Sequence, residues 1–112
     1  EVIKKYETQI KHEHVMLPSK ANYCEKHVYH IYCVRITNGK REDFQNYLKN
    51  NGVTTVIHYP IPIEETKAYS YLNVYNKNTR DWASEIISLP IHPFLKDHEI
   101  EHISSVVNNW EV

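Results

Sequence analysis

Glycine and cysteine are both scarce in this sequence, which contains two of each among 112 residues. The glycines, Gly39 and Gly52, stand apart, so there is no glycine-rich loop whose backbone amides could hold a phosphate group. The cysteines, Cys24 and Cys33, are too few for a disulfide framework and lack the CxxC spacing of metal and redox sites. These features speak against P-loop and dinucleotide-binding proteins, and they favour reduced thiols in a cytoplasmic protein.

A surplus of charge of one sign is also missing. Thirteen Lys and Arg residues balance 14 Asp and Glu residues, which gives a formal net charge of -1. Such a chain has no long-range field that would attract nucleic acids or anionic lipids. The opening residues 1–14 are charged throughout and contain no apolar run of the kind that a signal peptide needs. We therefore expect no nucleic acid and no membrane among its partners.

The proportions of residue types indicate one globular domain. Hydrophobic residues make up 41% and charged residues 24% of the sequence, as in ordinary soluble domains. A chain of this length can bury one core, so residues 1–112 are expected to form a single domain. Because the first residue is not methionine, we expect the domain to belong to a longer chain, with residues 1–14 as the end of a preceding helix.

The order of apolar residues predicts alternating helices and strands. Helical spacing marks residues 2–10, whereas residues 27–37 are rich in β-branched and aromatic residues and suit a central strand covered on both faces. The further expected elements are a helix at 40–51 ended by Gly52, a strand at 53–58, and short helices at 64–72 and 79–87. This order predicts an α/β (α+β) sandwich in which helices cover a small sheet, mainly on one face.

Two helices have an expected inward face. In the helix at 79–87, Trp82 and Ile86 are four residues apart and are expected to point inward together. The last helix is expected to begin with Asp97 as its N-cap. Its apolar stripe comprises Ile100, Ile103, Val106, Val107 and Trp110.

The last helix also carries the sequence His98-Glu99-Ile100-Glu101-His102, which matches the HExxH motif of zinc hydrolases. In that motif two histidines one turn apart bind zinc, and the glutamate activates water. The apolar stripe predicts that His98 and His102 face solvent, and no later His or Cys could supply a third ligand. A solvated helix face is therefore the preferred interpretation, and a zinc hydrolase is the disfavoured one. A nucleophilic pair of Cys33 and His30 is also disfavoured, since alternation on one strand would separate them.

Two proline-containing segments place hydrogen-bonding side chains on a stiff backbone. His58-Tyr59-Pro60-Ile61-Pro62 ends the strand expected at 53–58, because proline cannot donate to a β-ladder. An imidazole and a phenol at such a position suit a site for a polar ligand, and a purely structural strand exit explains them equally well. Ser88-Leu89-Pro90-Ile91-His92-Pro93 is a second segment of this kind.

These two segments, in this order, resemble the C-terminal domain of DegT/DnrJ/StrS-type sugar aminotransferases. The resemblance runs from about Val2 to Trp110 and includes the strand-like HVYHIYCVRI and the closing DHEIEHISSVVNNW. It implies a small, mainly antiparallel sheet covered by helices, as in the C-terminal domain of fold-type-I aminotransferases. It also implies a homodimeric parent enzyme that moves an amino group from glutamate to a keto-sugar nucleotide. In that enzyme a large N-terminal domain holds pyridoxal phosphate, and this domain forms one wall of the active-site cleft.

The resemblance also assigns site residues. It implies that His58, Tyr59 and Glu64 line the sugar end of the cleft, although Glu64 stands where family members commonly have a histidine. The Schiff-base lysine and the phosphate-binding groups would lie in the large domain. Within these 112 residues we therefore expect no catalytic residue, no bound cofactor and no metal. The alternative from another class is a non-catalytic interaction module that kept the fold.

Overall fold

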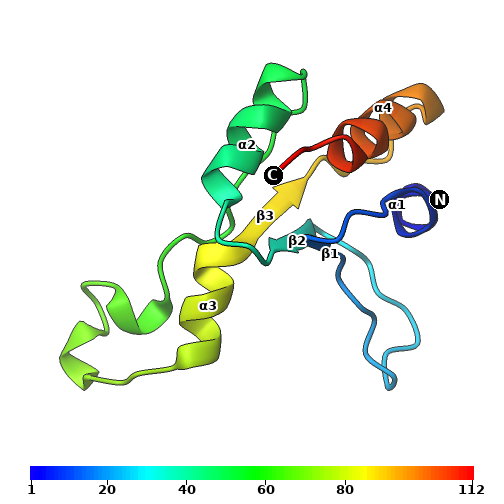
Figure 1. Cartoon of the computed structure of the whole chain (residues 1–112). Coiled ribbons are helices and arrows are strands. Elements are labelled where there is room, and N and C mark those ends of the chain that lie inside the picture. Colours follow the sequence, from blue (N-terminus) through cyan, green and yellow to red (C-terminus); the bar gives the residue numbers. More distant parts are fainter.

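A short antiparallel sheet forms the centre of the molecule, in a computed structural model that describes residues 1–112 (Figure 1). Its strands are β1 (Val15–Met16), β2 (Tyr32–Ile36) and β3 (Ile86–Leu89). The strand order is β1-β2-β3, so β2 is the central strand, as the sequence predicts. The register pairs Val15 with Ile36 and Tyr32 with Leu89.

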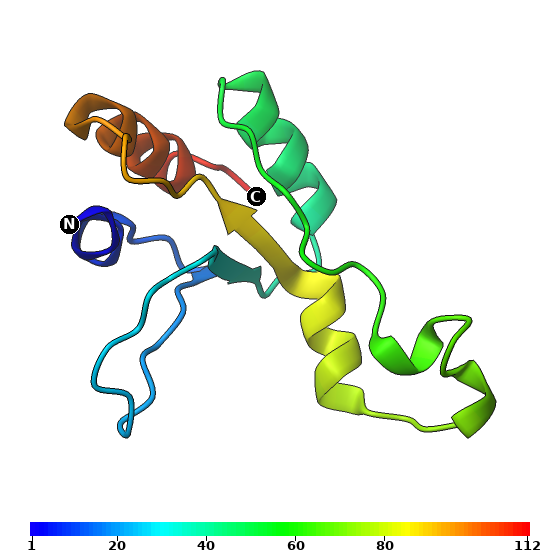
Figure 2. The same ribbon diagram turned by 180° about the vertical axis from the view of Figure 1, so that it is seen from behind.

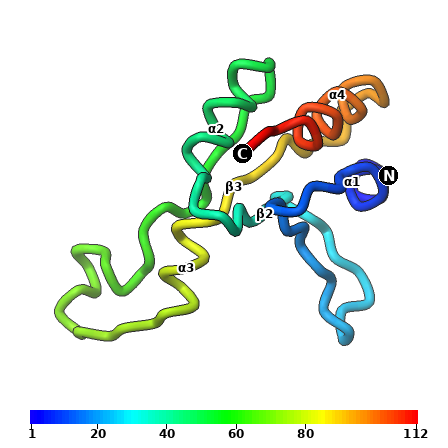
Figure 3. The backbone as a smooth tube through the Cα atoms, viewed as in Figure 1, coloured from blue at the N-terminus to red at the C-terminus, as the bar shows by residue number.

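Four α-helices and two 3₁₀ turns surround this sheet. They are α1 (Val2–Gln9), α2 (Arg41–Asn50), η1 (Ile63–Glu65), η2 (Ser70–Leu72), α3 (Lys77–Glu85) and α4 (Asp97–Asn108). Figures 1 and 2 show α1 beside α4 near the arrowhead end of β3, whereas α3 leads away from the opposite end and α2 starts close to the junction of α3 and β3. The tube in Figure 3 shows residues 59–76 as an excursion beyond α3. The predicted sandwich of helices on a small antiparallel sheet is confirmed.

Alternation along β2 decides which sheet face meets the core. Tyr32, Val34 and Ile36 are buried, whereas Cys33 and Arg35 between them are half-buried. The buried face packs against apolar side chains of α1, α2 and α4. The expected apolar cover on both faces is therefore only half correct, because the second face carries a cation and a thiol in place of aliphatic groups.

The two ends of the chain are joined through α1 and α4. The Tyr6 hydroxyl donates to the Pro90 carbonyl at 2.7 Å, and its ring lies 5.1 Å from that of Tyr32 between centroids. The His12 ring stacks on Trp110 at 5.3 Å, and its Nε2 lies 2.9 Å from the Trp110 carbonyl oxygen. The predicted helical stretch ends at Gln9, so residues 10–14 belong to a loop and not to the helix.

Local sequence patterns correctly predicted the helices α1, α2 and α4. The left-handed Gly39 and Gly52, with φ of 75° and 79°, flank α2, which agrees with a turn before it and a glycine stop after it. All five residues of the predicted apolar stripe of α4 are buried. The N-cap of α4 is Lys96 and not Asp97, which is the first helical residue and pairs with Lys5 at 2.6 Å.

Several predictions about the middle of the chain are wrong. Residues 53–58 form one isolated β-bridge and no strand, and the strand predicted at 27–37 begins only at Tyr32. The helix predicted at 64–72 consists of the two separate 3₁₀ turns η1 and η2. The helix predicted at 79–87 ends at Glu85, because the following apolar residues pair with β2 as strand β3. No helix in the fold has the length and apolar character that crossing a bilayer requires.

Candidate functional site

The two proline-containing segments meet at the outer edge of β3. Val56 and Ser88 form an antiparallel bridge, in which Ser88 N donates to Val56 O at 2.8 Å and Val56 N donates to Ser88 O at 3.3 Å. Two residues further on, His58 Nδ1 lies 3.0 Å from Ser88 Oγ. The bridge thus places the imidazole of the first segment on the hydroxyl of the second.

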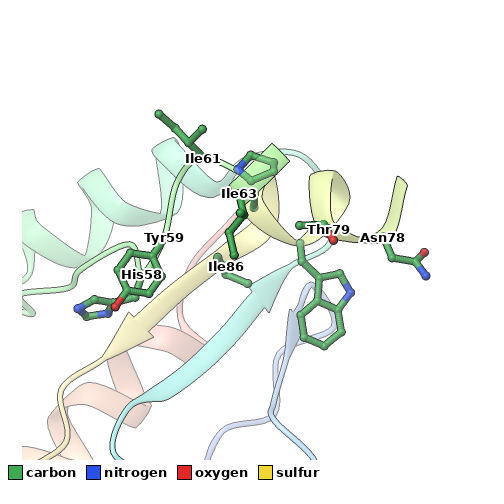
Figure 4. Close-up of a pocket in the computed structure, with 10 residues that line it drawn as sticks. His58, Tyr59, Ile61, Ile63, Asn78, Thr79 and Ile86 are labelled. Atoms are coloured by element: carbon green, nitrogen blue, oxygen red, sulfur yellow. The ribbon is translucent and has the colours of Figure 1, made fainter. Parts of the chain in front are cut away.

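A cavity of about 390 Å³ lies beside this contact, between residues 58–63 and helix α3. Figure 4 shows His58 and Tyr59 on one side and Asn78 and Thr79 on the other, with Ile63 and Ile86 between them. The complete lining is His58, Tyr59, Ile61, Pro62, Ile63, Asn78, Thr79, Trp82, Ala83 and Ile86. A mainly apolar hollow with a few converging polar groups is typical of a site for a small ligand.

Two of the side chains that line the cavity are solvent-exposed aromatic residues. Tyr59 is 78% exposed and Trp82 is 54% exposed, so neither belongs to the hydrophobic core. The inward orientation predicted for Trp82 is therefore wrong, and Ala83 is the buried residue of α3. The Trp82 ring lies over Arg35 instead, with 4.7 Å from the guanidinium carbon to the ring centroid.

The cavity surface carries no carboxylate, ammonium or guanidinium group. None of its lining residues is a Lys, Arg, Asp or Glu, and its polar groups are an imidazole, a phenol, an amide, a hydroxyl and an indole N–H. The nearby Arg35 is neutralised by Glu85, which accepts from Nε at 2.8 Å and lies 2.6 Å from Nη2. The lining therefore offers hydrogen bonds to an uncharged polar ligand rather than an ionic clamp.

The structure brings together two of the three site residues named in the sequence. His58 and Tyr59 both line the cavity, but Glu64 lies in η1 outside its lining. The Oε1 atom of Glu64 is buried and has no hydrogen-bond partner. Its neighbour Glu65 is paired with Arg80 at 2.7 Å.

Sequence reasoning missed the contribution of Ser88 and of α3. Ser88 belongs to the second proline-containing segment, yet no local pattern indicates that its hydroxyl reaches His58. Asn78 and Thr79 were also missed, since the first turn of an exposed helix has no distinctive signal. The sequence feature that pointed to this site was the pair of proline-containing segments, which are neighbours in space.

The residues of the HExxH motif form hydrogen bonds within α4 and with the neighbouring chain. His98 and His102 are exposed, as predicted, and His102 Nε2 lies 2.9 Å from the Asn51 carbonyl oxygen. Glu99 accepts a hydrogen bond from Lys96 N at 2.8 Å, which lowers the pKa of Glu99 and caps the helix. No group of three or more His, Cys, Asp or Glu side chains is placed to hold a metal ion.

Cys33 is paired across the sheet with Ser88 and not with a histidine. His30 precedes β2, so strand alternation does not decide its position relative to Cys33. The Cys33 thiol is half-buried, and burial raises its pKa. Its Sγ atom lies 4.0 Å from the carbonyl oxygen of Val34, and the residue is paired with Ser88 on β3.

Comparison with protein families and curated sequences places this architecture among transaminases. The model of the DegT/DnrJ/EryC1/StrS aminotransferase family matches residues 1–108. A dTDP-3-amino-3,6-dideoxy-alpha-D-galactopyranose transaminase from Aneurinibacillus thermoaerophilus is 35% identical over 111 residues, covering 98% of this chain and 30% of the relative. A UDP-2-acetamido-2-deoxy-3-oxo-D-glucuronate aminotransferase from Pseudomonas aeruginosa is 37% identical over 82 residues, covering 73% and 22%. The chain thus spans less than a third of the length of either relative.

Solved structures share the fold. DesV from S. venezuelae, determined in complex with a ketimine intermediate, matches with a TM-score of 0.87 and 24% identity, over 97% of this chain and 30% of that one. The ntda protein from Bacillus subtilis, with bound cofactor PMP, matches with a TM-score of 0.77 and 22% identity, over 95% and 26%. The three-stranded sheet and its helices therefore recur as one part of larger chains.

Proposed function

Because this chain belongs to the DegT/DnrJ/EryC1/StrS aminotransferase family, we propose that it is the C-terminal domain of a cytoplasmic, pyridoxal-phosphate-dependent sugar aminotransferase. The proposed substrates are glutamate as amino donor and a keto-sugar nucleotide as acceptor. Two relatives that support this choice are named as transaminases of dTDP- and UDP-linked sugars. A large N-terminal domain would complete the polypeptide, since the chain covers 30% of its 35%-identical relative. The proposed enzyme is a homodimer, as the family resemblance implies.

One observation carries the proposed location of the sugar. The first of the two segments that resemble the family in sequence lines the 390 Å³ cavity, and the contact between His58 and Ser88 joins the second segment to it. In the proposal, this side of the domain is the wall that faces the cleft. Its uncharged polar groups would bind the hydroxyl and carbonyl oxygens of a sugar, which are themselves uncharged.

His58 and Tyr59 take different parts in this proposal. The imidazole is oriented by Ser88, so its second ring nitrogen is the atom left for a sugar oxygen. The exposed phenol of Tyr59 can both donate and accept, and its ring can cover an apolar face of the sugar. Such contacts contribute to catalysis when they are stronger in the transition state than in the bound substrate.

Glu64 is proposed as a specificity residue rather than a direct part of the cavity. Its carboxylate has a buried oxygen without a partner, and such an oxygen is an acceptor that a bound group could satisfy. A substrate with a donor at this position would be favoured over one that lacks it, because leaving the oxygen unpaired is costly.

Pyridoxal phosphate does not fit the residues of this chain. Its aldehyde needs a lysine amine and its phosphate needs cations or a cluster of backbone amides. The cavity lining has no Lys or Arg, and both glycines occupy the turns that flank α2. In the proposal the cofactor is therefore held by the large domain, and this domain contributes contacts to the sugar.

Producing the parent enzyme from its full coding sequence tests this function. We expect a large domain with an internal lysine ahead of Glu1. We also expect the enzyme to transfer the amino group of glutamate to a dTDP- or UDP-linked keto-sugar, and mass spectrometry of the product measures this transfer. A parent without that lysine and without transfer activity would contradict the proposal and support the interaction module. Mutating the lysine to alanine in an active parent provides the matched control.

A further inference from the structure

Ser88 is held in place from both sides of β3. On one side it is paired with Cys33 of β2, and on the other it forms the bridge to Val56. Its side chain is almost fully buried, with the residue 5% exposed. Side chains of directly opposed residues in antiparallel strands lie on the same face, so the hydroxyl of Ser88 is next to the thiol of Cys33. The position of this hydroxyl is therefore set by three segments of the chain.

The hydroxyl has one proton and one hydrogen-bond partner. Ser88 Oγ lies 3.0 Å from His58 Nδ1, and no other group of the protein forms a hydrogen bond with it. An unprotonated Nδ1 accepts the serine proton, so the buried donor is satisfied.

The opposite direction of donation is poorer. If His58 Nδ1 carried the proton and donated to Ser88, the buried serine proton would have no acceptor other than the sulfur of Cys33 on the paired strand. A thiol sulfur is a weak acceptor, whereas an imidazole nitrogen is a strong one. Donation from Ser88 to His58 therefore gives the serine proton the better acceptor.

We propose that Ser88 is a positioning residue that fixes the neutral imidazole of His58 with its proton on Nε2. The ring then presents a hydrogen-bond donor, suited to a carbonyl or hydroxyl oxygen of the ligand. Only this last step rests on the proposed function, because the sugar contact belongs to that proposal. The direction of the hydrogen bond between Ser88 and His58 is a property of this domain alone.

The ring tautomer can be measured without any substrate. The chain is labelled with ¹⁵N-histidine, and long-range ¹H–¹⁵N correlation spectra are recorded at about pH 8, where an unperturbed histidine is neutral. The signals of His58 are identified by their loss in His58→Gln. We expect the pattern of a single tautomer protonated at Nε2. A ring protonated at Nδ1, or an exchanging mixture of both tautomers, would overturn the proposal.

Two substitutions at one position separate positioning from packing. Ser88→Ala removes the donor, so the His58 ring should change to a mixture of tautomers. Ser88→Thr keeps a hydroxyl on a strand that favours β-branched residues, and it should restore the Nε2–H pattern. An Nε2–H tautomer that persists in Ser88→Ala would contradict the assignment. If Ser88→Ala does not fold, as judged by circular dichroism, the tautomer of the unmodified chain decides the question.

Kinetics in the parent enzyme keep this proposal distinct from the proposed function. Ser88→Ala should lower kcat/KM by about two- to tenfold, the size expected for one neutral hydrogen bond. Combined with His58→Ala it should add nothing further, because both act through the same ring. An unchanged kcat/KM in His58→Ala would refute the sugar contact and leave the tautomer result standing. An Nδ1–H ring with an impaired His58→Ala enzyme would refute the positioning and leave the sugar contact standing.

Discussion

The Trp82 ring lies over the guanidinium of Arg35, with 4.7 Å from the Arg35 Cζ atom to the ring centroid. Arg35 is held in turn by Glu85, so the three side chains form a connected group on the second face of the sheet. This contact explains how a tryptophan that is 54% exposed keeps a defined place at the edge of the cavity. It also separates the role of Trp82 from that of a core residue.

Removing Trp82 should cost little stability. An exposed cation–π contact contributes about 0.5–1 kcal/mol, so Trp82→Ala should lower the free energy of unfolding by roughly that amount. Urea denaturation followed by circular dichroism measures the change. A loss of about 3 kcal/mol or more would mean that Trp82 packs inward after all, as its helical spacing with Ile86 suggests.

Trp110 should behave in the opposite way. It is 6% exposed, stacks on His12 and lies 4.7 Å from Phe44 between ring centroids. Trp110→Ala should destabilise the fold by about 3 kcal/mol through the cavity that it leaves. The exposed His102 is the matched control on the same segment, and His102→Ala should cost no more than about 1 kcal/mol. Equal losses in thermal or urea unfolding would indicate that α4 is rotated relative to this structure.

The proposed sugar contacts can be tested in the parent enzyme. His58→Ala should lower kcat/KM between several-fold and about a hundredfold, the range for losing a hydrogen bond to a neutral or a charged group. Tyr59→Phe, which keeps the ring and removes only the hydroxyl, should lie at the small end of this range. Thermal unfolding of each variant serves as the control for folding. Full activity in both would mean that the segment is only a structural strand exit.

Glu64→Gln addresses substrate choice. The change removes the negative charge and keeps one carbonyl acceptor, so folding should be unaffected. If the carboxylate reads a donor on the sugar, the ratio of kcat/KM values between two keto-sugar nucleotides should change. Competition between dTDP- and UDP-linked substrates in one reaction measures that ratio directly. A ratio identical to that of the unmodified enzyme would assign Glu64 no part in selecting the sugar.

The reactivity of Cys33 should depend on pH in a definite direction. Burial raises the pKa of this thiol, and only the thiolate reacts with iodoacetamide. Alkylation in a Cys24→Ser background should therefore be slow at neutral pH and accelerate above the ordinary pKa of 9.0. Because the folded state favours the protonated thiol, its contribution to stability is complete below pH 9.0 and is lost as pH rises through the raised pKa. A rate that reaches its plateau near neutrality would disprove the raised pKa.

The parts of the fold that local sequence patterns describe were predicted correctly. Helix α4 follows from one apolar stripe, and α2 follows from its apolar face and the turn and stop at Gly39 and Gly52. The failures lie where local preference and tertiary pairing differ. Ile86 and Ile87 continue the helical spacing of α3, yet Ile86–Leu89 forms a strand because β2 offers hydrogen-bond partners about fifty residues earlier in the chain.

In the candidate site, too, some features follow from local sequence and others only from tertiary structure. The sequence by itself determined the two proline-containing segments, the imidazole of His58 and the phenol of Tyr59, since prolines restrict the backbone wherever they stand. The partner of His58 was decided only by tertiary structure. Ser88 reaches it through the bridge to Val56, and the position of Trp82 depends on Arg35 of another element. Such contacts depend on the relative placement of distant segments, which no short-range periodicity encodes.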